Sequence, residues 1–435
     1  MEYTPAIVAT AMLLYGLASR RLERSPITGP MLFTAVGLLI GPEVLDILDF
    51  GTDIDTIDLV LTVTLALVLF TDAGAINSSH WREDAALPGR LLGIGLPLMI
   101  VFGWGSALLM LTDLEVWEAA VLATMLAPTD AALGKAVVSN PRVPLKIRQA
   151  LNVESGLNDG IALPVFVVFL EAAVIAEGSL TAGDFVSELV PEVGVALLVG
   201  IGVGWVGSLA IDGAARRGLA VFYWLEISVV ALALGAYAVT TPLGGSGFIA
   251  AWVAGVMFGR VCRLSAASDE PDNADVDEAS NAAGVRDVHE LAEAGGDALT
   301  MISFLLFGAF LGPALTDVTA LEVAYGLVSL VILRLAAVLI ACIGSGLDWP
   351  SKLFLGWFGP RGLATIILTI AIVGESDLRG ASMIADTALI AVALSAVLHG
   401  ATAWWGSNAY ADVEEHADDM HDDMPAVRIP RRMLP

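Results

Sequence analysis

The sequence predicts an all-α protein with many membrane-spanning helices, and three observations support this fold class. Of the 435 residues, 57% are hydrophobic and 16% are charged, a balance that soluble domains of this length rarely show. Apolar runs long enough to cross a bilayer recur along almost the whole chain. The runs lack the alternating pattern of barrel strands, and only helices and closed barrels satisfy the backbone within lipid. We therefore expect a polytopic bundle of transmembrane helices.

About thirteen spans are expected, several of them bounded by Pro or Gly in the connecting turns. The expected spans are 4–19, 27–41, 57–75, 87–111, 116–139, 146–175, 188–210, 219–240, 245–261, 297–315, 320–343, 350–373 and 383–405. No basic segment precedes the first run, so we expect it to be a retained helix and not a cleaved signal peptide.

The basic residues predict the orientation of the bundle. Lys and Arg gather in alternate loops, for example Arg20 and Arg24 after the first span and Arg216 and Arg217 after the seventh. The opposite loops are acidic or neutral, apart from Arg379. By the positive-inside rule, the N-terminus is expected outside a plasma membrane and the C-terminus in the cytoplasm. An odd number of spans agrees with these two positions.

Two acidic segments account for much of the net charge of −26. We expect a membrane transporter domain over 1–410, with an acidic cytoplasmic loop at 264–296 and an acidic cytoplasmic tail at 411–435. Dense carboxylates are typical of solvated surfaces adapted to high salt, so a halophilic source is expected. The alternative is a regulatory cation-binding loop, but the acidic spacing matches no EF-hand.

Two spans are expected to be discontinuous. Ala127-Pro-Thr-Asp130 lies within the fifth span and Phe358-Gly-Pro-Arg-Gly362 within the twelfth. Proline removes a backbone donor and clashes with the preceding turn, so each helix should break there and free carbonyls for binding an ion. If the seventh span is a linker, each break falls in the fifth helix of a six-helix unit. This arrangement predicts inverted repeats with two crossed discontinuous helices and a site between them.

A polar cluster in the sixth span indicates the site. Glu154, Ser155, Asn158 and Asp159 lie within an otherwise apolar segment, where each charged residue costs about 2.5–3.5 kcal/mol on insertion scales. Ser155 and Asp159 are four residues apart and share a helix face, as do Glu154 and Asn158. We expect this cluster to face the break in the fifth span.

The residue types predict a cation site. Together with Thr129 and Asp130 at the break, Ser155 and Asp159 offer hard oxygen ligands, which suit Na⁺ or Li⁺. No His or Cys lies in the cluster, so neither zinc nor copper is expected. His399, near the end of the last span, is expected at the membrane interface.

Buried charge in the cluster needs a counter-charge. Arg334 lies mid-span with no acid nearby in the sequence, so we expect it to pair with Glu154, with Arg361 as a further positive charge at the second break. The alternative for Arg334 is snorkelling to an interface. Two roles stay open for Asp72, near a span end: it lines an ion funnel, or it is structural.

The same oxygens that bind a cation can bind a proton instead. Burial disfavours the charged form of a carboxyl group, so Asp159 should hold either a proton or a cation, but not both. If one of the two must be bound before the site changes sides, the competition couples both fluxes without ATP.

Four sequence features resemble the monovalent cation/proton antiporter family, in its branch with an Asn-Asp pair. They are Thr129-Asp130, Glu154-Ser-Gly-Leu-Asn-Asp-Gly160, Gly359-Pro-Arg-Gly362 and the late membrane residue Arg334. The similarity covers about 4–405. It implies a homodimer in which each protomer has an interface domain and a mobile core domain.

The resemblance also implies roles for individual residues. Asp159 would alternately bind cation and proton, with Thr129, Asp130 and Ser155 as further ligands. Glu154 would pair with the late arginine.

Asn158 would mark the branch that exchanges one cation for one proton without net charge transfer. The sequence departs from the family after Asp130, where Ala131-Ala-Leu133 replaces the more usual Pro-Val-Ala.

The leading hypothesis is therefore a Na⁺/H⁺ antiporter that also accepts Li⁺ and is not an enzyme. We expect no cofactor and no nucleic-acid partner. The nearest alternative is a K⁺/H⁺ antiporter, because ligand number and cavity size separate these ions. An intramembrane aspartyl protease and a sensor without transport activity are alternatives of other classes. The sequence contains no Gly-x-Gly-Asp motif, which argues against the protease.

Overall fold

The computed structural model describes residues 4–22, 25–47, 54–75, 85–138, 140–174, 182–268, 290–373 and 378–422. Within these ranges every regular element is a helix, and helices cover each of the expected spans, so the helical fold class is confirmed. The elements are α1 (Thr4–Leu22), α2 (Gly29–Ile40), α3 (Ile54–Ala75), α5 (Ala86–Arg90), η2 (Leu91–Gly95), α6 (Leu96–Met110), α7 (Val116–Met125), α8 (Ala131–Val138), α9 (Leu145–Val174), α10 (Ala182–Arg216), α11 (Phe222–Thr240), η3 (Thr241–Leu243), α12 (Gly247–Ser268), α14 (Glu290–Asp317), α15 (Ala320–Leu327), η4 (Val328–Leu333), α16 (Arg334–Ala341), α17 (Trp349–Trp357), α18 (Leu363–Val373) and α19 (Ala381–Asp422).

Nine helices of the described chain are long and apolar enough to cross a membrane. Three shorter apolar helices accompany them, namely α2, α7 and α18. Most of the expected acidic loop (264–296) and the end of the acidic tail lie outside the described residues.

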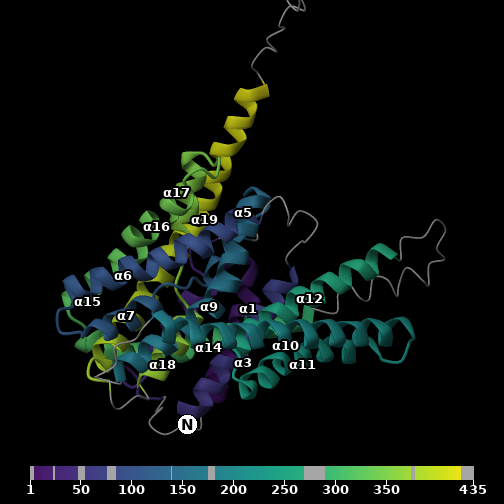
Figure 1. Ribbon diagram of the computed structural model, residues 1–435, viewed down its shortest axis with the longest axis horizontal. Coiled ribbons are helices and arrows are strands. Elements are labelled where there is room, and N and C mark those ends of the chain that lie inside the picture. The colour runs from purple at the N-terminus through teal and green to yellow at the C-terminus, as the bar shows by residue number, and fades with distance from the viewer. Residues whose placement is uncertain are drawn as a thin grey trace, which may run out of the picture.

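Several helices extend beyond the spans predicted for them, and α10 and α19 extend furthest in total. α10 begins before and ends after the expected 188–210, and α19 continues past 405 to Asp422. Apolarity defines only the part of a helix that can lie in lipid, whereas residues such as Glu414 and Glu415 favour helix in water as well. The expected boundary at 410 therefore falls inside a continuous helix. In Figure 1 the end of α19 projects away from the rest of the bundle.

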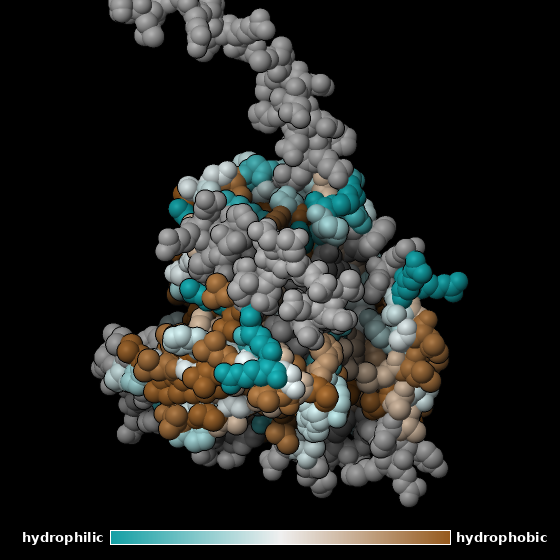
Figure 2. Space-filling model, turned by 90° about the vertical axis from the view of Figure 1, so that its right-hand side faces the viewer, coloured by the Kyte–Doolittle hydropathy of each residue, from teal (hydrophilic) through white to brown (hydrophobic). Residues whose placement is uncertain are grey.

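The helices form two groups around the centre of the bundle. α10, α11 and α12 pack against one another on one side, and α6, α15 and α16 lie on the opposite side (Figure 1). On this side of the molecule hydrophobic side chains cover much of the lower half, and hydrophilic side chains lie among them and at the top (Figure 2). Leu198, Trp205 and Val206 of α10 are exposed, as expected of a helix that faces lipid.

Glycines bring two helix pairs into backbone contact. A Cβ built on Gly37 of α2 or Gly308 of α14 would lie 1.9 or 2.1 Å from a carbonyl oxygen of the other helix. The same test on Gly255 and Gly259 of α12 gives 2.1 and 2.2 Å to carbonyl oxygens of α3. Such close approach is the usual role of small residues in membrane bundles.

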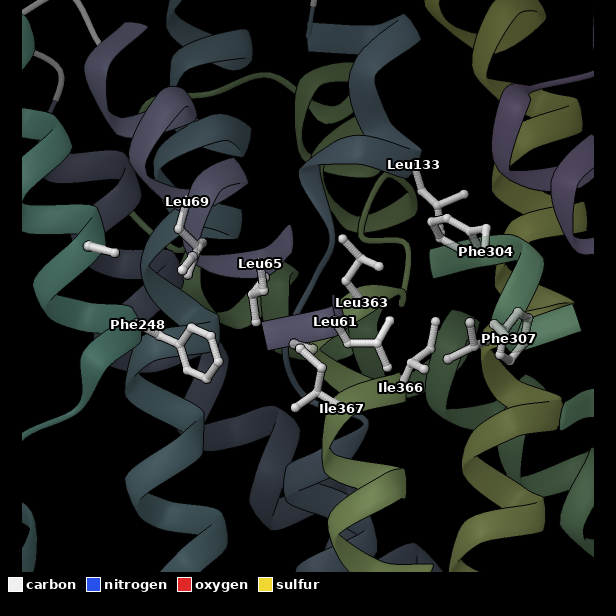
Figure 3. Close-up of a cluster of buried hydrophobic side chains, with 14 of the residues drawn as sticks. Leu61, Leu65, Leu69, Leu133, Phe248, Phe304, Phe307, Leu363, Ile366 and Ile367 are labelled. Carbon is white, nitrogen blue, oxygen red and sulfur yellow. The ribbon is translucent and has the colours of Figure 1, made fainter. Parts of the chain in front are cut away.

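A large hydrophobic cluster lies where these pairs meet the discontinuous helices. It joins Leu133 of α8 and Leu363 of α18 with side chains of α3, α12 and α14 (Figure 3). The first turns of two half-helices are thereby held in one core.

Candidate functional site

Both predicted helix interruptions are present. α7 ends at Met125 and α8 begins at Ala131, with Pro128 in the extended segment between them. α17 ends at Trp357 and α18 begins at Leu363. Each interruption leaves helix ends with unsatisfied backbone groups inside the bundle, and these groups require partners.

The two interrupted segments contact each other. The Asp130 N–H donates to the Pro360 carbonyl at 2.7 Å. Arg361 Nη1 donates to the carbonyls of Ala127 and Pro128 at 2.7 and 2.6 Å. Arg361 is fully buried. Its guanidinium therefore hydrogen-bonds carbonyls that have no helical N–H partner because of the first break. The expected position of Arg361 at the crossing is observed.

Asp130 caps two half-helices at once. Its Oδ1 accepts from the Leu133 N–H of α8 at 3.4 Å, and its Oδ2 accepts from the Leu363 N–H of α18 at 2.7 Å. A carboxylate stabilises helix N-termini through these bonds and through the helix dipole. A Cβ on Gly362 would lie 1.8 Å from Asp130 Oδ2, so the approach requires glycine there. The residue predicted as a ligand thus has both oxygens engaged in helix caps.

Three of the predicted polar side chains meet beside the first break. Thr129 Oγ1 lies 3.0 Å from Ser155 Oγ, and Asn158 Nδ2 donates to Thr129 Oγ1 at 2.7 Å. All three residues are buried. Asn158 therefore holds the threonine against α9 in addition to occupying the position next to Asp159.

Asp159 supplies a buried carboxylate next to this group. The residue is 8% exposed, and its charge interacts with those of Asp130, Arg361 and Asp72. Within the described chain, Asp159 Oδ1 and Asn158 Oδ1 are buried acceptors without a hydrogen-bond partner. Buried acceptors of this kind are costly, so a bound proton or cation would stabilise them.

The predicted ion pair between Glu154 and Arg334 forms and is bidentate. Arg334 Nη2 donates to Glu154 Oε2 at 2.9 Å, and Nη1 donates to Oε1. Arg334 is 2% exposed and also donates to the Leu355 carbonyl at 3.2 Å. The snorkelling alternative is therefore wrong. Arg334 directly follows the π-helical turn η4, and such turns are frequent at functional sites.

His399 is buried between helices, and its expected place at the membrane interface stays a prediction. The residue is 1% exposed, its Nδ1 lies 3.0 Å from Ser395 Oγ, and its ring packs on Trp357 with centroids 5.7 Å apart. α19 continues past residue 399 to Asp422. Ser395 was not among the predicted residues, although its four-residue spacing from His399 indicates a shared helix face.

Two further observations bear on the chemistry. Asp72, on α3, is half-buried and belongs to the charges that act on Asp159. Among the residues that the structure describes, no three or more His, Cys, Asp or Glu side chains cluster as a metal site.

Comparison with known proteins gives a consistent result. A family model described as "Sodium/hydrogen exchanger, transmembrane" matches residues 7–405. The chain is 25% identical over 408 residues to a K(+)/H(+) antiporter NhaP2 of a Shewanella species, covering 91% of this chain and 64% of the relative. It is 27% identical over 359 residues to a K(+)/H(+) antiporter NhaP of Alkalimonas amylolytica, covering 80% and 57%. The chain thus spans less than two thirds of these relatives.

The fold also resembles that of a solved structure. The sodium proton antiporter MjNhaP1 from Methanocaldococcus jannaschii aligns with a TM-score of 0.74 and 19% identity, over 94% of this chain and 98% of that one. At this identity the likeness is one of fold.

Proposed function

Because the chain belongs to the sodium/hydrogen exchanger family, we propose that it exchanges a monovalent cation for protons across a membrane by alternating access. Na⁺ is the leading cation, with Li⁺ accepted as well. One observation carries the proposal: the buried Asp159 carboxylate lies one helical turn from Ser155, at the crossing of two discontinuous helices, with an unpartnered Oδ1. The protease alternative is excluded, because the family is one of transporters.

The proposed coupling rests on competition at Asp159. Oxygens of Thr129, Ser155, Asn158 and Asp159 bind the cation, whereas a proton on Asp159 neutralises the same carboxylate. Asp130 joins the two half-helices, so that both move together when the site changes sides.

We assign a stoichiometry of one cation for one proton. Arg334 balances Glu154, and the two half-helix N-termini engage Asp130. Asn158 has no titratable group, so Asp159 is the one residue of the pair that exchanges a proton for a cation. The site then carries the same charge with either ion bound, and a membrane potential does no net work on the cycle.

K⁺ is the second candidate, because the curated relatives reported above are named as K(+)/H(+) antiporters. Hard oxygen ligands bind both ions, and cavity size and ligand number discriminate between them.

We also propose thirteen spans in two inverted six-helix repeats, 1–6 and 8–13. Equivalent positions carry equivalent features: the fifth and twelfth spans are broken, and the fourth and eleventh contain the π-helical turns η2 and η4. The backbone contact of α2 with α14, the second and tenth spans, corresponds to that of α12 with α3, the ninth and third.

The N-terminus is proposed outside the plasma membrane and the C-terminus in the cytoplasm, within a homodimer. Three arginines at the proposed cytoplasmic ends cap helix carbonyls there, as cations do at helix C-termini. These are Arg90 with Ala341, Arg148 with Val138 and Arg263 with Gly74. The acidic loop (264–296) within the domain at 1–410, and the acidic tail beyond that domain, would be solvated surfaces suited to high salt.

Proteoliposomes containing a pH dye test the exchange. Na⁺, Li⁺ or K⁺ added outside should make the lumen alkaline, and the concentration dependence ranks the three ions. Absence of a pH change with every cation would refute exchange. A potential of about 100 mV acts with about 2.3 kcal/mol on each net charge moved, so a rate that depends on the potential would refute one-to-one exchange.

A further inference from the structure

α19 contains a serine and a histidine that the exchange scheme leaves unused. Ser395 and His399 are both buried. Ser395 Oγ accepts the Arg361 N–H at 2.7 Å and lies 3.0 Å from His399 Nδ1. One hydrogen bond thus connects α19 to the second helix break, and a second one adjoins it within α19.

The same pattern occurs at the first break. Ser155 and Asp159 are four residues apart on α9, as Ser395 and His399 are on α19. Ser155 Oγ lies 3.0 Å from Thr129 Oγ1, as Ser395 Oγ lies 2.7 Å from the Arg361 nitrogen.

The partners in the two breaks are also equivalent. Thr129 and Arg361 each lie two residues before the second half-helix begins, at Ala131 and Leu363 respectively. α9 and α19 are the sixth helices of the two proposed repeats. In both repeats, therefore, a serine one turn before a polar residue contacts the equivalent residue of the break.

The second break also contacts the first one. The Arg361 guanidinium donates to the carbonyls of Ala127 and Pro128, and Pro128 directly precedes the proposed ligand Thr129. Any displacement of the Arg361 backbone would shift the donors that hold these carbonyls.

The hydrogen-bond directions suit a positioning role. Because Ser395 Oγ accepts the Arg361 N–H, its own proton can be donated to His399 Nδ1. The imidazole, whose ring packs on Trp357 of α17, then limits the rotation of the serine hydroxyl.

We infer that Ser395 and His399 are the second-repeat counterpart of Ser155 and Asp159, and that they form a positioning pair. The pair holds the Arg361 backbone and, through the guanidinium, the carbonyls next to Thr129. The inference rests on the proposed exchange and the proposed repeats. It makes neither residue a ligand of the transported ion.

Transport kinetics of three variants test the pair. Ser395→Ala and His399→Leu should raise the KM for the transported cation about 3- to 10-fold, the effect of one lost hydrogen bond, with a maximal rate close to that of the wild type. His399→Asn should restore the KM, because the asparagine amide reaches the position of Nδ1.

Thr387→Val is the matched control. Thr387 is also buried in α19, but its hydroxyl donates to the Met383 carbonyl of the same helix. A KM at the control value in both Ser395→Ala and His399→Leu would overturn the inference, and so would a His399→Asn variant as impaired as His399→Leu.

Hydrogen–deuterium exchange separates this inference from the proposed function. Ser395→Ala removes the acceptor of the Arg361 N–H, so a peptide covering 358–362 should exchange faster than in Thr387→Val. Equal protection would overturn the positioning role. If the wild type moves no cation, exchange is refuted, while the protection of 358–362 still decides whether the pair holds this break.

Discussion

Asp130 hydrogen-bonds the first residue of a helix that lies 233 positions further along the chain, with its Oδ2 2.7 Å from the Leu363 nitrogen. Its second oxygen accepts from Leu133 of its own half-helix. One carboxylate therefore neutralises two helix N-termini that meet inside the bundle. The two halves of the crossing are joined by this side chain as well as by Arg361.

Asp130→Ala should be among the most destabilising single substitutions at the crossing. It removes two caps, each worth about 0.5–2 kcal/mol, and leaves buried donors unpaired. Thermal unfolding in detergent measures the effect. Asp348→Ala is the control, because Asp348 caps only α17, by accepting from the Ser351 N–H at 3.3 Å. An equal loss of stability in both variants would contradict the double cap.

Gly362→Ala should give little folded protein. The added Cβ would lie 1.8 Å from Asp130 Oδ2, so either the cap or the backbone must shift. Gly235→Ala in α11 meets nothing within 4 Å and should be neutral or slightly stabilising, since alanine favours helix over glycine. Size-exclusion yields of the two variants should therefore differ clearly. Equal yields would rule out the close approach.

Breaking the buried ion pair should lower the stability more than removing an exposed charge does. Arg334→Ala leaves Glu154 charged and unpaired, for which about 3–5 kcal/mol is typical. Arg217→Ala removes an exposed arginine and should leave the unfolding temperature unchanged. In a double-mutant cycle with Glu154→Gln, the second substitution should recover part of the loss. Strict additivity of the two effects would mean that the pair contributes no coupling.

Asp159→Ala should abolish exchange without loss of folded protein, because Oδ1 makes no hydrogen bond within the described residues. A cation at 100 times its Kd stabilises a folded protein by about 2.7 kcal/mol, so Na⁺ should raise the unfolding temperature of the wild type and not that of the variant. Substantial transport by Asp159→Ala would refute its assigned role.

Local chemistry made much of the site predictable from sequence. Pro128 breaks its helix through its own missing N–H, and the cost of burying Arg334 alone required an acidic partner such as Glu154. Nothing near Asp130 in the sequence reports that its carboxylate reaches Leu363, because the two helices meet only in the assembled bundle.

Helix length and helix type were harder to predict than the breaks. The apolar pattern ends near residue 405, whereas α19 continues through acidic residues to Asp422. The π-helical turn before Arg334 has no local signature in Val328–Leu333. Such features depend on packing between helices, which an apolar pattern does not encode.

The dependence of the cation KM on pH tests most directly whether proton and cation compete for Asp159. Initial rates of cation-driven exchange would be measured in proteoliposomes at fixed internal pH and several external pH values. With competition, the KM rises as the pH falls, by up to about tenfold per unit where the proton dominates, while the maximal rate at saturating cation stays constant. A KM that stays constant while the maximal rate falls would contradict a shared site.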